Sequence, residues 1–179
     1  MTPSGLSLEG RVWRFGDNIN TDLIFPNKAF QLPLAEQHRL VFSANRPGWV
    51  DQVVEGDLII AGHNFGTGSS RVVGRVLKNC GIAGLVAESL NGLCLRSCVT
   101  FSFPAIECPG VTGLFDEGQR ARVDFVSGTV ENLTSGQALQ GRGLPPLLLE
   151  TILAGGVVPM LAREGYIEVQ ERRPPTSKP

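Results

Sequence analysis

The sequence has little of what a nucleic-acid-binding or membrane protein needs. Sixteen basic residues face 17 acidic ones, so the net charge at pH 7 is −1 and no basic surface is expected. Aromatic residues make up only 7% of the 179 positions, with a single tyrosine. The longest apolar run, around residues 147–149, is far shorter than the roughly 20 residues of a transmembrane helix. We therefore expect no nucleic-acid partner and no membrane partner.

Metal ligands are scarce as well. The four cysteines stand at positions 80, 94, 98 and 108, and the two histidines, His38 and His63, do not cluster with them, so we expect no metal site in this chain. The first five residues show no charged segment followed by an apolar one, hence no signal peptide, and we expect a cytoplasmic protein with reduced thiols. Cys94 and Cys98 are spaced to share a helix face, where small buried side chains are the favoured interpretation.

The length and a hydrophobic content of 42% suit one globular domain with a real core. We expect this domain to span residues 1–170. Residues 171–179 contain three prolines and mixed charge, which predicts a flexible tail.

Apolar patterns predict an α/β fold. Residues 10–16 alternate as an opening strand, and residues 56–62 and 82–87 read as buried strands. Between the buried strands, apolar residues recur at helical spacing after Arg71, and this pattern ends at Gly81. A strand, a helix and a strand with short connections imply a parallel, right-handed unit.

The remaining segments carry weaker patterns. We expect a short helix near 34–42 within an irregular connection over 27–50, a helix over 88–96, and a strand over 99–107 interrupted by Pro104. Surface strands are expected at 119–125 and 128–132, followed by helices at 147–154 and 157–163. Trp13 and Trp49 are expected as core and loop anchors.

The most informative segment is Gly-His-Asn-Phe-Gly-Thr-Gly-Ser-Ser-Arg at 62–71, between a buried strand and the helix. Its glycines let the backbone turn sharply and approach a ligand closely. Unpaired N–H groups and the dipole at a helix N-terminus attract anions, and we expect Ser69, Ser70 and Arg71 to lie there. The pattern predicts a carboxylate or phosphate site. The competing interpretation is that the serines merely cap the helix.

Four segments of the sequence resemble motifs of a known family. Residues 17–26, Asp-Asn-Ile-Asn-Thr-Asp-Leu-Ile-Phe-Pro, resemble the D-x-I-x-T-D-x-I-x-P signature of the aconitase swivel domain, and 62–71 its G-x-N-F-G-x-G-S-S-R loop. Residues 77–82 are similar to its L-x-x-x-G-I, and 154–159 to the A-G-G-L-V-P of the stand-alone small subunits. Over residues 8–166 the sequence resembles the small subunit of 3-isopropylmalate dehydratase.

The resemblance implies a swivelling β/β/α domain that closes over a separate large subunit in a heterodimer or heterotetramer. That partner would carry a [4Fe–4S] cluster with an open iron acting as a Lewis acid, and this chain would bind no cofactor. The family reaction removes water from a 2-hydroxy di- or tricarboxylate and adds it back with the hydroxyl shifted. It implies a lyase of leucine biosynthesis that interconverts 2- and 3-isopropylmalate.

The resemblance also implies roles for residues. Ser69 would be the catalytic base that takes the carbon-bound proton, Ser70 would bind substrate and oxyanion, and Arg71 would clamp a carboxylate. Thr21 and Asp22 would line the floor of the site. Further substrate-binding positions would be Asn64, Gly66 and Gly68. The substrate-specificity loop would comprise Asn27, Lys28, Ala29, Phe30, Gln31 and Leu32.

Two departures from the family pattern bear on specificity. Val72 and Val73 follow Arg71 where the family commonly has Glu-His, and Ser97, Thr100 and Ser102 precede Pro104 where it tends to have N-x-x-N-x-G. The chemistry is expected to survive with altered surroundings, on isopropylmalate or on another hydroxy acid of a specialised pathway. A non-catalytic carboxylate-binding module is the alternative, whereas a nucleotide hydrolase lacks its G-K-[ST] lysine.

Overall fold

The computed structural model describes residues 5–168, so the expected tail at 171–179 lies outside the described residues. Its first half contains β1 (Ser7–Phe15), α1 (Thr21–Ile24), the 3₁₀ helices η1 (Asn27–Gln31), η2 (Gln37–Leu40) and η3 (Val50–Gln52), β2 (Leu58–Ala61), α2 (Val73–Asn79) and β3 (Gly84–Ala87). The second half contains α3 (Gly92–Thr100), β4 (Ala105–Glu107), α4 (Val111–Leu114), β5 (Arg120–Asp124), β6 (Thr129–Asn132), β7 (Ala138–Gln140), α5 (Pro146–Leu153) and α6 (Val157–Arg163).

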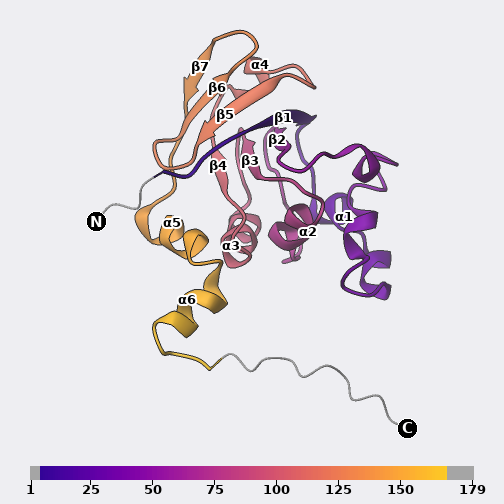
Figure 1. Ribbon diagram of the computed structural model, residues 1–179. Coiled ribbons are helices and arrows are strands. Elements are labelled where there is room, and N and C mark those ends of the chain that lie inside the picture. Colours follow the sequence, from indigo (N-terminus) through magenta and orange to yellow (C-terminus); the bar gives the residue numbers. More distant parts are fainter. Residues whose placement is uncertain (1–4, 169–179) are drawn as a thin grey trace.

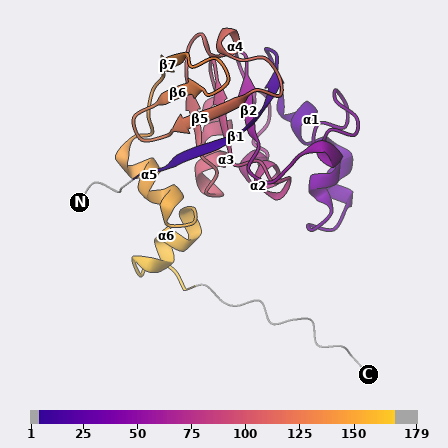
Figure 2. The ribbon, with the colours of Figure 1, turned by 45° about the horizontal axis from the view of Figure 1, so that its top comes forward.

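One mixed sheet organises the chain, with its strands in the order β4-β3-β2-β1-β5-β6-β7 (Figure 1). Strands β1 to β4 pair in parallel, whereas β5, β6 and β7 pair antiparallel. The long strand β1 belongs to both halves, because its end pairs with β2 and its beginning lies antiparallel beside β5 (Figure 2). The predicted α/β fold and the parallel unit β2-α2-β3 are therefore confirmed.

The sheet curls until its two edges meet. Directly after β7, the amide of Arg142 donates a hydrogen bond to the carbonyl of Glu107 at the end of β4, at 2.9 Å. Helices α2 and α3 cover the outer side of the parallel strands, and the antiparallel strands curve away on the other side (Figure 1).

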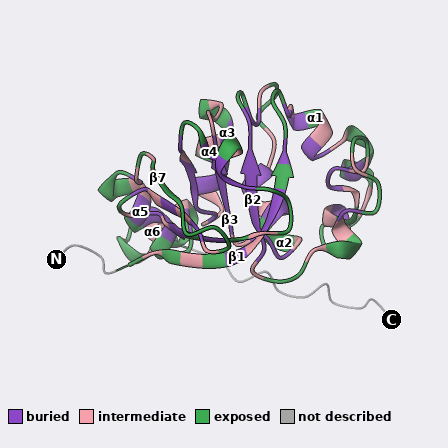
Figure 3. Ribbon diagram, turned by 90° about the horizontal axis from the view of Figure 1, so that it is seen from above, coloured by how far each residue is buried: buried purple, intermediate pink, exposed green. Residues whose placement is uncertain are grey.

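Two apolar cores lie on opposite faces of the parallel strands. On β2, Ile59 and Ala61 join the core beneath α2 and α3, while Leu58 and Ile60 join the core enclosed by the antiparallel strands. Because both faces are covered, β2 and β3 are buried along their whole length (Figure 3). Trp13 and Trp49 are both in the first core, as expected for anchors.

Several boundaries differ from expectation. The helix expected over 88–96 begins only at Gly92, because the Asn91 side chain accepts a hydrogen bond from the amide of Leu93 and so fixes the start. It continues to Thr100, which leaves only Ala105–Glu107 as the strand expected over 99–107. The helix near 34–42 is a single 3₁₀ turn, η2, and strand β7 was not anticipated.

Helices α5 and α6 match the two C-terminal helices that were expected. Within residues 5–168, no single helix has the length and apolar content to cross a membrane. Together α5 and α6 would meet those criteria, but the pair is bent by 87°.

Candidate functional site

The two segments that carry the family motifs lie side by side at one edge of the sheet. Residues 17–22 follow β1 and residues 62–71 follow β2, and parallel neighbours end at the same edge, where α/β proteins bind ligands. Backbone hydrogen bonds join the segments, from Asn18 N to His63 O at 2.7 Å and from Gly66 N to Ile19 O at 2.7 Å. A third runs from Thr21 N to Thr67 O at 2.8 Å. The two motifs therefore form one structural unit.

Glycine is required at the closest contacts of this unit. Gly66 and Gly68 have φ of +76° and +108°. A Cβ on Gly66 would lie 2.3 Å from the Cβ and Sγ of Cys94, and one on Gly68 would lie 2.9 Å from Thr21 Oγ1. Asn64 also has a positive φ, and its Nδ2 donates to Asn18 Oδ1 at 3.0 Å. Gly68 thus permits a close approach between the two motif segments, and Gly66 a close approach to helix α3. The predicted approach of this backbone to a ligand stays a prediction.

Ser69 and Arg71 are brought together at this edge. The Nε–H of Arg71 donates to Ser69 Oγ at 3.2 Å, and Thr21 Oγ1 lies 3.4 Å from the same oxygen. Ser69 and its neighbour Ser70 are exposed, whereas Thr21 is buried. The arrangement offers an accessible hydroxyl next to a guanidinium, which stabilises negative charge on that oxygen.

The other donors of Arg71 reach back to α1 and η1. Its Nη1 donates to the carbonyl of Phe25, and its Nη2 donates to Asp22 Oδ1 and to Asn27 Oδ1, the latter at 3.0 Å. The guanidinium also lies over the ring of Phe30, 5.6 Å from its centroid. Arg71 therefore connects Ser69 to the predicted specificity loop, and Asp22 is its ion-pair partner.

Within that loop, Ala29 is fully buried and anchors η1 to the core. Lys28 and Gln31 are exposed, and the ring of Phe30 is 53% exposed although its edge packs against Phe25. Leu32 is half-buried at the end of η1. The side chains on the outer face of the loop are thus free to meet a ligand beside Arg71.

The predicted position of the serines at a helix N-terminus is wrong. Helix α2 begins at Val73, its N-cap is Val72, and no side chain caps it. Val73 is fully buried in the core that lies between the sheet and helices α2 and α3, and Val72 packs against that core. The packing of these two apolar side chains therefore sets the start of the helix. Ser69 and Ser70 are therefore not caps of α2, and the charged group that contacts Ser69 is the guanidinium of Arg71.

A carboxylate that the sequence analysis did not single out lies after β3 at the same edge. Glu88 accepts hydrogen bonds from Gly110 N, from Thr112 N at 2.9 Å and from Thr112 Oγ1 at 2.6 Å. Partial burial would raise the pKa of Glu88, but the bonds from Thr112 and Gly110 and the nearby His63 outweigh it, so the pKa is lowered. The sequence signal for Glu88 is its position, an acidic residue directly after a buried strand.

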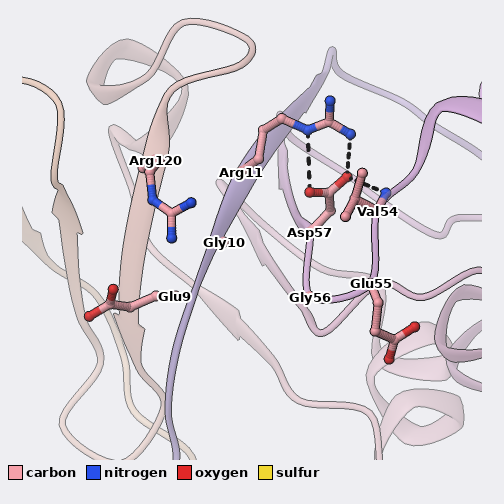
Figure 4. Close-up of a pocket in the computed structure, with 8 residues that line it drawn as sticks. All are labelled: Glu9, Gly10, Arg11, Val54, Glu55, Gly56, Asp57 and Arg120. Atoms are coloured by element: carbon pink, nitrogen blue, oxygen red, sulfur yellow. Dashed lines mark hydrogen bonds and ion pairs between the residues drawn. The ribbon is translucent and has the colours of Figure 1, made fainter.

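A separate hollow of about 320 Å³ lies at the amino-terminal end of β2 (Figure 4). Its wall holds Asp57, which accepts from Arg11 Nη2 at 2.6 Å, from Trp13 Nε1 at 2.7 Å and from Val54 N at 2.9 Å. Asp57 is buried and its oxygens are taken up by these donors. This cluster stabilises the fold rather than exposing a reactive group.

The cysteines do not fit an iron–sulfur cluster. In the part of the chain that the structure describes, no three His, Cys, Asp or Glu side chains converge on a possible metal position. Cys94 and Cys98 are buried, as expected, and Cys108 is buried as well. The hydrogen bond with Cys94 together with burial raises the pKa of Cys98. Burial raises the pKa of Cys80 to about 12. Cluster ligands must be thiolates, which these environments disfavour.

Comparisons with known proteins agree with the motifs. No family model matches the chain. The isopropylmalate/citramalate isomerase small subunit of Methanocaldococcus jannaschii is 36% identical over 159 residues, which cover 88% of this chain and 95% of the relative. The 2,3-dimethylmalate dehydratase small subunit of Eubacterium barkeri is 34% identical over 172 residues, 93% of this chain and all of the relative. The crystal structure of 3-isopropylmalate dehydratase from M. jannaschii superimposes with a TM-score of 0.83 at 25% identity, covering 89% of this chain and 96% of that one.

Proposed function

The chain belongs to the family of 3-isopropylmalate dehydratase small subunits, and we propose that it completes the active site of a hydro-lyase together with a large subunit. The observation that carries the proposal is the contact of the exposed Ser69 hydroxyl with Arg71 and Thr21, at the edge where the two motif segments are joined. This edge is open in the isolated chain and offers a surface over which a partner can close.

Ser69 is the proposed base. Its alkoxide takes the proton from the carbon next to the one that carries the hydroxyl, the C–H electrons form the double bond, and the C–O bond breaks with the hydroxyl leaving as hydroxide. The proton on Ser69 and this hydroxide together make up the water that is eliminated. Addition of water with the positions of H and OH exchanged gives the isomeric hydroxy acid. A serine alkoxide is a rare species in bulk water, so it requires Arg71 beside it and a site closed to solvent.

Ser70 and the backbone at Gly66 and Gly68 are proposed to bind substrate oxygens next to the base. Ser70 is exposed beside Ser69 and makes no hydrogen bond with another described side chain. Arg71 is proposed to hold a substrate carboxylate, since a guanidinium fork matches carboxylate geometry. Asn64 and Thr21 hold the loop in place beneath them.

The proposed substrate is isopropylmalate, in leucine biosynthesis, with another 2-hydroxy dicarboxylate as the alternative. The outer side chains of η1, above all the ring of Phe30 next to Arg71, are proposed to contact the group attached to the malate skeleton. The relatives carry names that include citramalate and dimethylmalate, so the alternative has a specific basis. These acids share the two carboxylates and differ in the size of the apolar group.

The large subunit is proposed to hold the [4Fe–4S] cluster, because the described residues of this chain do not fit one. When bound there, the open iron supplies a Lewis acid for the hydroxyl that leaves. This chain then supplies the base, Ser69, and the guanidinium of Arg71 that binds a substrate carboxylate.

Reconstitution tests the proposal. The chain purified alone should show no turnover, and addition of the large subunit encoded in the same organism should give hydration and dehydration with one acid of a panel containing isopropylmalate, citramalate and 2,3-dimethylmalate. A non-catalytic carboxylate-binding module is favoured only if the isolated chain binds one of these acids tightly and no partner gives turnover. Absence of turnover with every acid and the correct partner contradicts the proposed function.

A further inference from the structure

The geometry points to Asp22 as an internal competitor of the substrate, occupying in the free subunit the edge of Arg71 that a substrate carboxylate takes. Substrate binding is then an exchange of one carboxylate for another. This inference rests on the proposed function, because it assigns to Asp22 a place in the binding step at the same site.

The hydrogen bonds of Arg71 show why an exchange is required. A guanidinium has five N–H donors. The Nε donor is used by Ser69, one Nη1 donor by the Phe25 carbonyl, and the Nη2 donors by Asp22 and Asn27. A bidentate fork for an incoming carboxylate needs two donors on one edge, so at least one contact within the chain must first be broken.

Asp22 is the contact most easily given up. Its side chain is 64% exposed, whereas that of Arg71 is 8% exposed, so the carboxylate lies between the guanidinium and solvent. Phe25 is buried and its carbonyl is fixed by the core, and the Ser69 contact is needed for catalysis. An exposed aspartate can rotate into water at little cost, since contact with water weakens its attraction to the guanidinium.

The exchange couples the substrate to the specificity loop. Asp22 lies in α1, and the loop that follows it holds the same guanidinium through Asn27 and places Phe30 over it. When a substrate carboxylate replaces Asp22, the loop keeps only its neutral contacts with Arg71. Only molecules in which Arg71 has released Asp22 can bind the substrate carboxylate. The apparent affinity is therefore the intrinsic affinity multiplied by the fraction of such molecules.

The test is Asp22→Asn in the complete enzyme, assayed with the acid that the wild-type pair converts. An amide keeps the shape and loses the charge, so the KM for that acid should fall about 3–10-fold while kcat changes less than about 2-fold. Asp22→Glu keeps the charge and should leave the KM near the wild-type value or above it. Glu9→Gln removes a charge from an exposed ion pair with Arg122, outside the site, and should change neither constant.

The salt concentration separates direct occupancy from long-range repulsion. A decrease in KM that persists at about 0.5 M salt supports the exchange, whereas a decrease that disappears there reports only the lost repulsion and contradicts it. An unchanged or raised KM in Asp22→Asn means that Asp22 supports Arg71 and overturns the inference, while the proposed function stands. A wild-type pair without any turnover overturns both.

Discussion

The Nε–H of Arg71 donates to Ser69 Oγ across 3.2 Å, and this pair is supported from a part of the chain more than 40 residues earlier. Phe25 and Asn27 accept from the far side of the same guanidinium, so the base and the loop next to the substrate share one positively charged side chain. A change of Arg71 itself is therefore expected to affect both catalysis and binding.

Ser69→Ala should abolish turnover of the reconstituted enzyme, with a loss in kcat of at least about 10³-fold, because the proposed base is removed. Assembly with the large subunit, measured by size-exclusion chromatography, should be unchanged. Ser127→Ala, in the turn between β5 and β6, is the matched control and should retain full activity. A fully active Ser69→Ala enzyme would show that another group takes the proton.

Arg71→Lys keeps the positive charge but removes the paired N–H donors of the guanidinium. One ammonium group cannot serve Ser69, Phe25, Asp22 and Asn27 at once, so we expect kcat to fall about 10²-fold and the KM to rise. Steady-state kinetics on the reconstituted pair checks this. Arg75→Lys, on α2 with a single side-chain bond to Gln37, should have a much smaller effect. An equal decrease in kcat in the two variants would contradict the proposed role of Arg71 in the site.

Gly66→Ala should destabilise the fold by about 2–4 kcal/mol. The added methyl group would lie 2.3 Å from Cys94, and the φ of +76° is unfavourable for alanine. Urea unfolding followed by circular dichroism measures the change. Gly113→Ala, within helix α4 with no atom near the new Cβ, should be neutral or slightly stabilising. A second change, Cys94→Ala, should recover part of the loss in Gly66→Ala.

Asp57→Asn tests whether the cluster in Figure 4 is structural. The amide cannot accept from Arg11, Trp13 and Val54 together, so the variant should lose about 2–4 kcal/mol of unfolding free energy. Activity per folded molecule should not change. Glu9→Gln, on the rim of the same hollow, should cost no more than about 0.5 kcal/mol.

The lowered pKa of Glu88 predicts a stability change at acidic pH. The carboxylate prefers the folded state, so its stabilisation is complete well above its ordinary value of 4.5 and is lost as the pH falls through the lower folded value. The difference in unfolding free energy between wild type and Glu88→Gln should therefore be largest near pH 6 and shrink below about pH 4. Thr112→Val removes one donor and should show an intermediate pH dependence. A difference that stays constant over this range would contradict the assignment.

The central elements and the site loops were predictable from local patterns. Buried runs such as Ile59–Ala61 and the glycine stop at Gly81 are set by nearby residues, and the two motifs identified the loops that the structure joins. The start of α2 was not predictable from capping rules, because Val73 is fixed by tertiary packing. The use of Arg71 by α1 and η1 depends on contacts across more than 40 residues, which no local pattern encodes.

The double role of β1 has a consequence for how the chain folds during synthesis. Its end pairs with β2 about 45 residues later, but its beginning waits for β5, which follows more than 100 residues later. Contacts of such long sequence separation slow folding, so the parallel half should become protected first on the ribosome. Until residues 120–124 emerge, the first half of β1 is an unpaired edge, and a chaperone that shields exposed strands should bind there.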